Sequence, residues 1–245
     1  MSTITDVKDL AWYGTGRLGL PTLHHVASID KFNITVLVRR DPASYSGLPS
    51  DVQVKQIDFA ERSTLVNALV GHDAVVVFTS MAPHNDMDII ELELINATPV
   101  IAAKREVHNY LLARSSEGKI DFATLHAGNM LTSVGMFASI HVAKRIAILP
   151  DGGDHPISIS SKETLGKGLV GLLSKYPENK NTHLYICNGE TTMKQIVLAV
   201  QKASGSEEAW NISSYSLEEN KKKADGNLRN GSISLTDFVG VLAVP

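Results

Sequence analysis

A glycine-rich stretch close to the beginning of the chain constrains the fold more than any other feature. Residues 9–13 form a short apolar run, and Gly14, Gly16 and Gly19 follow it with the spacing Gly-x-Gly-x-x-Gly. A second apolar run, residues 33–38, begins after a gap long enough for one helix. This order of strand, loop, helix and strand predicts the first βαβ unit of a dinucleotide-binding fold.

Each glycine of the loop has a predicted role. Gly14 permits a tight turn, Gly16 lets the backbone approach a pyrophosphate, and Gly19 lets the helix pack closely on the strand. The helix N-terminus that follows attracts an anion. The candidate cofactor-binding residues in this loop are therefore Gly14, Thr15, Gly16, Arg17, Leu18 and Gly19.

Two arginines at the end of the second strand predict which cofactor is bound. A site for NAD usually has an acidic residue here, which accepts a hydrogen bond from the ribose 2′-hydroxyl. This chain has Arg39 and Arg40, and arginine pairs with a 2′-phosphate. NADP(H) is therefore favoured over NAD(H). Two alternatives stay open: the arginines are solvated surface residues beside Asp41, or Asp41 itself binds the ribose.

Strand and helix signals alternate through the first part of the chain. Residues 52–57 alternate apolar and polar side chains, residues 61–70 have helical spacing, and residues 74–78 read as a central parallel strand buried on both faces. Further expected elements are a helix at 100–113, strands at 122–125, 146–149 and 184–187, and helices at 161–173 and 191–205. The pattern predicts an α/β protein with a Rossmann-type, doubly wound parallel sheet.

The domain organisation follows from the same pattern. Residues 1–130 are predicted to form the NAD(P)-binding domain, and residues 131–245 a smaller α+β substrate-binding portion intertwined with it. His126 and Asn129 follow a predicted parallel strand at its carboxyl end, where ligand sites of α/β sheets lie. We therefore take His126 and Asn129 as candidate substrate-binding residues.

Composition restricts the function classes. The net charge is −3 and no basic face is evident, so nucleic acid is not an expected partner. His24 and His25 have no third ligand at a suitable spacing, so no metal site is expected. No signal peptide or membrane-spanning run is evident, and we expect a cytoplasmic protein that does not bind membranes. The only cysteine, Cys187, reads as a buried strand residue.

The order of these features resembles the NmrA-like and isoflavone-reductase-like branch of the atypical short-chain dehydrogenases/reductases, particularly its fungal members. The matching stretches are residues 13–19, 36–39, 54–58, 65–78, 99–104 and 151–158. In this chain the glycine motif is one residue shorter than is usual in the family. A helix and a parallel strand of the family, roughly two dozen residues, are missing between Phe78 and Pro99, and the C-terminal end stops early.

The resemblance implies roles for particular residues. Lys104 matches the lysine that acts as general acid/base in family reductases with phenolic substrates; the alternatives are a surface lysine or a ribose ligand. Asp58 matches a position near the adenine, and a helix N-cap is its alternative role. We also count Thr79, which directly follows residues 74–78, among the candidate cofactor-binding residues.

Three functions are compatible with these observations. The first is an NADPH-dependent reductase of a small, aromatic or carbonyl-containing substrate. The second is a non-catalytic NADP(H) sensor of the nitrogen metabolite repressor type, which would bind a protein partner. The third is a truncated paralogue without a function of its own. Lys104 favours the reductase, and the missing sheet segment favours the other two.

Overall fold

The computed structural model describes residues 6–78, 101–132, 140–205 and 209–230. The chain forms two compact units, and neither is a continuous stretch. The first unit comprises Met1–Ser80, Phe122–His126 and Lys162–Ile186, and the second comprises Met81–Asp121, Ala127–Ser161 and Cys187–Pro245. The sequence predicts a division of the chain at residue 130 into a cofactor-binding and a substrate-binding portion. The compact units do not test this division, which stays a prediction.

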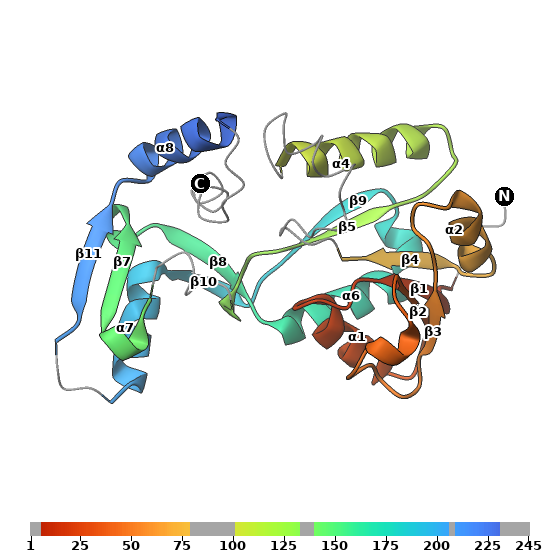
Figure 1. Ribbon diagram of the computed structural model, residues 1–245, viewed down its shortest axis with the longest axis horizontal. Coiled ribbons are helices and arrows are strands. Elements are labelled where there is room, and N and C mark those ends of the chain that lie inside the picture. The colour runs from red at the N-terminus through yellow and green to blue at the C-terminus, as the bar shows by residue number, and fades with distance from the viewer. Residues whose placement is uncertain (1–5, 79–100, 133–139, 206–208, 231–245) are drawn as a thin grey trace. The chain divides into compact units, whose positions relative to one another are not determined.

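A parallel sheet with the strand order β3-β2-β1-β4 forms the centre of the first unit (Figure 1). The elements of this unit are β1 (Asp9–Tyr13), α1 (Gly19–Ala27), β2 (Asn33–Val38), β3 (Gln53–Gln56), α2 (Arg62–Leu69), β4 (Ala74–Val77), β5 (Ala123–Ala127), α6 (Lys162–Ser174) and β9 (Thr182–Ile186). β1 lies between β2 and β4, and the predicted Rossmann-type parallel sheet is confirmed.

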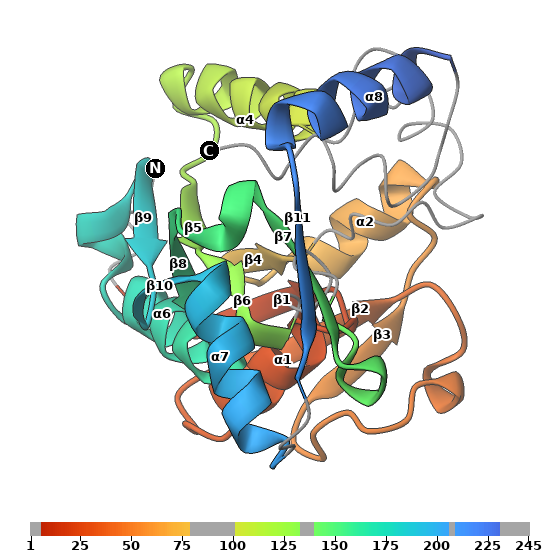
Figure 2. The same ribbon diagram turned by 90° about the vertical axis from the view of Figure 1, so that its left-hand side faces the viewer.

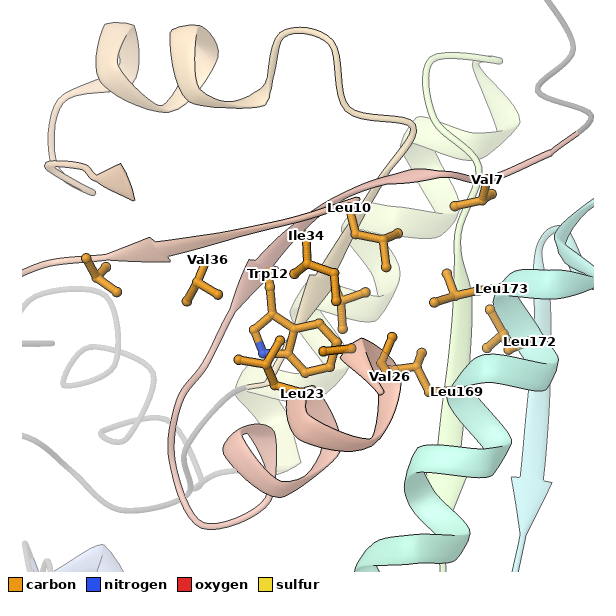
Figure 3. Packing of buried hydrophobic residues seen from close by; sticks show 13 residues of the cluster. Val7, Leu10, Trp12, Leu23, Val26, Ile34, Val36, Leu169, Leu172 and Leu173 are labelled. Atoms are coloured by element: carbon orange, nitrogen blue, oxygen red, sulfur yellow. The ribbon is translucent and has the colours of Figure 1, made fainter. Parts of the chain in front are cut away.

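Alternation of side chains along β1 explains how two helical layers cover this sheet. Leu10 and Trp12 point to one face and pack in a cluster with residues of α1 and α6, which Figure 3 shows. Ala11 points to the other face, where it joins Leu37 and Ala68, the latter from α2. Successive strand residues face opposite sides of a sheet, so an uninterrupted apolar strand fits a position between two layers.

The prediction that residues 74–78 are buried on both faces is wrong. Only Val76 is buried, whereas Val75 and Val77 are 47% and 55% exposed. β1 is the one strand paired with β4 in the described part of the chain. β5 pairs instead with β9 in a separate two-stranded sheet. Residues 79–100, where the missing strand is expected, lie outside the described residues, so that prediction is not tested.

The second unit contains small sheets of mixed direction. Its elements are α4 (Ile101–Ser116), β6 (Asn129–Met130), β7 (Ile146–Pro150), β8 (Pro156–Ser160), β10 (Gly189–Thr192), α7 (Met193–Ala203), β11 (Asn211–Tyr215) and α8 (Leu217–Arg229). β8 pairs with β10 antiparallel and with β6 parallel, and β11 runs parallel to β7. Figure 2 shows β11 beside β7. Short 3-10 helices are found at Pro42–Ser44 in the first unit, at Val142–Lys144 and Asp151–Gly153 in the second, and at Tyr176–Asn179 in the first.

A small apolar cluster holds α7 in the second unit. Met193 and Val197 of this helix pack against Ala147 and Leu149 of β7. The helix begins with a capping box, in which the Thr192 hydroxyl accepts from the Gln195 backbone and the Gln195 side chain accepts from the Thr192 backbone. α7 therefore has both an apolar contact and a capped N-terminus.

Cys187 does not have the predicted environment. β9 ends at Ile186, and the Cys187 side chain is exposed. The strand signal is correct, but it extends one residue too far. Within the described ranges, no helix combines the length and the hydropathy needed to cross a lipid bilayer.

Candidate functional site

The glycine loop, residues 14–19, connects the carboxyl end of β1 to α1. Gly14 has a φ of +115°, which residues with a side chain rarely adopt. The buried Trp12 ring lies beneath the loop, and its indole Nε1 donates to the Gly14 carbonyl over 2.9 Å. A Cβ at Gly19 would collide with that same carbonyl oxygen. Two of the three glycines are thus required by the packing of the fold.

Gly16 differs from the other two glycines. A Cβ placed on it would meet no atom within 4 Å, and its φ lies outside the left-handed region. Gly16 and Arg17 are exposed, and in the described part of the chain no acceptor contacts their amide N–H groups. The first turn of α1 contains no acidic residue. Available amides on exposed residues just before a helix N-terminus favour an anion at this position.

The remaining loop residues shape the start of α1. The Leu18 carbonyl accepts from both the backbone N–H and the hydroxyl of Thr22, over 3.2 Å and 2.8 Å. The Gly16 carbonyl accepts from the Leu20 N–H. Thr15 is half-buried and is not part of these bonds. The Gly16 and Leu18 carbonyls are therefore bonded to residues of α1, whereas the Gly16 and Arg17 amides are available to a ligand.

Arg39, at the end of β2, is held by two aromatic side chains. Its Nη2 donates to the Tyr13 hydroxyl over 2.7 Å, and its Cζ lies 5.4 Å from the centre of the Phe59 ring. The Tyr13 and Phe59 rings are in turn 4.6 Å apart. The ion pairs found among the described residues do not include Arg39. The arrangement provides a fixed positive charge that retains its capacity to bind an anion.

The acidic residues near Arg39 are engaged in local turns. Asp41 accepts from the Ala43 N–H over 2.9 Å and begins a 3-10 helix. Asp58 is exposed and accepts from the Ala60 N–H over 2.9 Å. The N-cap of α2 is Glu61, so the alternative of Asp58 as the cap of this helix is wrong. Arg40 is exposed beside Arg39.

Two sequence-predicted residues fall where the structure gives no side-chain position. Thr79 lies outside the described residues. Lys104 lies in the first turn of α4, within the second unit, and its side chain is outside the described part. The predicted roles of Thr79 and Lys104 therefore stay predictions.

The substrate-binding candidates are in different units. His126 belongs to β5 in the first unit, and Asn129 belongs to β6 in the second. The Asn129 amide donates to the Ser158 carbonyl over 3.3 Å, which supports the β6–β8 pairing. This bond gives Asn129 a structural role in its sheet.

His126 is one member of a polar and aromatic group on β5 and β9. Its Nε2 lies 3.0 Å from the Thr124 hydroxyl, which also contacts Nδ1 of His183. The His126 ring stacks on Tyr185, with 4.8 Å between ring centres. Sequence reasoning missed His183 and Tyr185, because their strand follows β5 by some 59 residues and no motif links the two.

The second unit has a separate depression of about 220 Å³, lined by residues of α7 and β11 together with Leu149 and Gly152. Lys194 lies at this depression and pairs with Asp154 over 3.1 Å. The depression contains none of the sequence-predicted site residues. In the described ranges, no group of three or more His, Cys, Asp and Glu side chains is arranged to hold a metal ion.

Comparison with solved structures identifies proteins of the same fold. A nucleoside-diphosphate-sugar epimerase from Staphylococcus aureus is 19% identical with a TM-score of 0.62, covering 96% of this chain and 90% of that chain. The Citrobacter triphenylmethane reductase, solved with NADP(H), is 15% identical with a TM-score of 0.63, covering 96% and 88%. A UDP-glucose 4-epimerase from Thermus thermophilus, solved with NAD, is 12% identical with a TM-score of 0.58, covering 85% and 86%.

These similarities define the class of fold as a Rossmann-type α/β fold, shared with a reductase solved with NADP(H) and an epimerase solved with NAD. No protein-family model matches the chain, and no curated protein sequence matches it significantly. At identities below 20%, the comparisons establish the fold alone. Function must be argued from the site.

Proposed function

We propose that this protein binds NADP(H) at the glycine loop and acts as an oxidoreductase on a small aromatic or carbonyl-containing molecule, as the resemblance to isoflavone-reductase-like proteins implies. The pyrophosphate would contact the amides of the exposed Gly16 and Arg17, in the loop just before α1. Arg39 would bind the 2′-phosphate, with Arg40 adjacent. The chemistry supplied by a bound NADP(H) is hydride transfer.

One observation carries the cofactor assignment. The Arg39 guanidinium is fixed by Tyr13 and Phe59 at the end of β2, without a carboxylate partner in the described part of the chain. A fixed, uncompensated guanidinium favours a phosphate group. Its position at the end of the second strand is the one that reads the ribose in dinucleotide-binding folds.

We further propose individual roles for Asp58, Thr79, Lys104, His126 and Asn129. Asp58 retains a carboxylate oxygen for the adenine amino group, because its Asx turn uses only Oδ1. Lys104 would act as the proton donor toward the substrate, and His126 and Asn129 would contact the substrate. Thr79 would contact the cofactor.

The experiment is a titration of purified protein with NADP⁺ and NAD⁺ by calorimetry. We expect tighter binding of NADP⁺ by the wild type. Arg39→Ala removes a charge-assisted contact and should weaken NADP⁺ binding by about 10- to 100-fold, with little change for NAD⁺. Equal losses for the two dinucleotides would show that Arg39 does not read the 2′-phosphate.

A second candidate function is a non-catalytic NADP(H) sensor that binds a protein partner. The observation in its favour is the exposed face of β4, where Val75 and Val77 remain accessible and no second strand partner lies among the described residues. The sensor would bind NADP(H) as tightly as the reductase would. NADPH consumption with carbonyl compounds separates the two, since the sensor would show none.

A further inference from the structure

We infer that Tyr13 is a positioning residue for Arg39, and that its hydroxyl sets how strongly the site prefers a dinucleotide carrying a 2′-phosphate. The inference rests on the proposed NADP(H) function and assigns a role to a residue outside the loop glycines. Tyr13 is the last residue of β1 and immediately precedes Gly14.

Three contacts hold the half-buried Arg39 at the end of β2. The Tyr13 hydroxyl accepts from Nη2 over 2.7 Å, and the Phe59 ring faces Cζ at 5.4 Å. The Gln56 amide donates to the Arg39 carbonyl over 3.2 Å and holds the backbone at the strand end. The guanidinium is thus held from one edge by Tyr13 and from one face by Phe59.

The alternation of side chains along β1 determines the face of the sheet on which Tyr13 lies. Leu10 and Trp12 point toward α1, so Tyr13 emerges on the opposite face, where Phe59 follows β3. The two rings are 4.6 Å apart and tilted by 47°. Tyr13 therefore links the glycine loop to the residue that would read the 2′-phosphate.

Preorganisation explains why this contact matters. An arginine side chain loses considerable rotamer freedom when it binds a phosphate. A hydrogen bond that already holds the guanidinium reduces the entropy lost on binding and increases affinity for the group it faces. The effect acts through Arg39, so it should affect NADP⁺ and leave NAD⁺ unchanged.

The test is a double-mutant cycle with Tyr13→Phe and Arg39→Ala, titrated with NADP⁺, NAD⁺ and 2′,5′-ADP. Tyr13→Phe keeps the ring against Phe59 and removes only the hydroxyl. We expect it to weaken NADP⁺ and 2′,5′-ADP by about three- to tenfold and NAD⁺ by less than twofold. In the Arg39→Ala background the same substitution should have no effect. Tyr215→Phe, on β11 of the second unit, is the matched control and should bind all three ligands as the wild type does.

The outcomes separate this inference from the proposed function. Normal NADP⁺ binding by Tyr13→Phe, together with a loss in Arg39→Ala, overturns the positioning role and leaves the proposed function intact. An equal loss for NAD⁺ assigns Tyr13 a general structural role and overturns the inference. A loss that persists in the Arg39→Ala background means that Tyr13 contacts the phosphate itself, which also overturns positioning through Arg39. If the wild type binds none of the three ligands, both proposals fail.

Discussion

Substituting alanine for Gly14 tests whether the loop has the tight geometry described above. The backbone at Gly14 has a φ of +115°, and an added Cβ would lie 2.6 Å from the Phe78 Cβ and 2.7 Å from the Phe78 carbonyl oxygen. Both neighbouring atoms belong to Phe78, which directly follows β4, and the carbonyl oxygen is a backbone atom. Neither can move away at small cost, so we expect the variant to be strongly destabilised.

The magnitude follows from two contributions. Holding a residue with a side chain in this backbone region costs about 1–3 kcal/mol. Forcing a methyl group into a packed site costs about 1–3 kcal/mol more. A combined loss of about 4 kcal/mol is a large share of the 5–15 kcal/mol that stabilises a typical domain. For a chain of this length it lowers Tm by roughly 8–16 °C.

The assay is urea denaturation followed by fluorescence, with a thermal melt of the same samples. Gly16→Ala is the matched control, because nothing lies within 4 Å of its added Cβ and its φ is accessible to alanine. We expect its stability to equal or slightly exceed that of the wild type, by up to about 1 kcal/mol. A Gly14→Ala variant as stable as Gly16→Ala would refute the loop geometry on which the site is built.

Two further predictions concern a carboxylate and the proposed proton donor. The pKa of Asp73 is held below its ordinary value because the backbone N–H groups of Asp9 and Lys8 donate to its carboxylate, each over 2.9 Å. This contribution is fully present above the ordinary pKa and is lost as the pH falls through the lower folded-state pKa. Urea denaturation should therefore show Asp73→Asn about 1 kcal/mol less stable at pH 7, with the difference vanishing in acid; a constant difference would contradict the linkage. Lys104→Ala should lower kcat by about 10²–10⁴-fold on the aromatic carbonyl compound that the wild type reduces fastest, with unchanged NADPH affinity. A parallel loss of NADPH affinity would indicate a ribose ligand instead.

The first βαβ unit could be predicted because local and tertiary requirements agree there. The apolar run of β1 fits between two layers, and the glycines mark the turn that follows it. The same agreement explains α2, which the sequence places at residues 61–70 and the structure at Arg62–Leu69. Where periodicity, glycine and packing indicate one element, a single sequence is sufficient.

Other features depend on contacts that leave no local signal. β11 contains the sequence Asn-Ile-Ser-Ser-Tyr, which lacks an apolar alternation, and its strand conformation comes from pairing with β7. The exposure of Val75 and Val77 follows from the neighbours that β4 has, and a run of valines cannot report those. Tertiary context overrides propensity in both cases.

The candidate site also contains features with a local sequence signal and features that depend on tertiary contacts. The loop and Arg39 could be predicted because a motif fixes their positions in a βαβ unit. The contact of Arg39 with Tyr13 and Phe59 could not, since the three residues come from three different strand ends. Only the parallel pairing of β1, β2 and β3 brings these ends to one edge of the sheet.

The three glycines of the loop carry different information about function. Gly14 and Gly19 are explained by the fold, because a side chain at either would collide with the backbone of the first unit. Their presence would be required even in a protein that binds nothing.

Gly16 has no such requirement, and a glycine without a packing reason lowers stability through the entropy of the unfolded chain. Close approach of a ligand to the backbone gives a physical reason for glycine at this exposed position. The argument for a bound dinucleotide therefore depends on Gly16 and Arg39 more than on the motif as a whole, and Gly16→Ala should weaken NADP⁺ binding while leaving the fold intact.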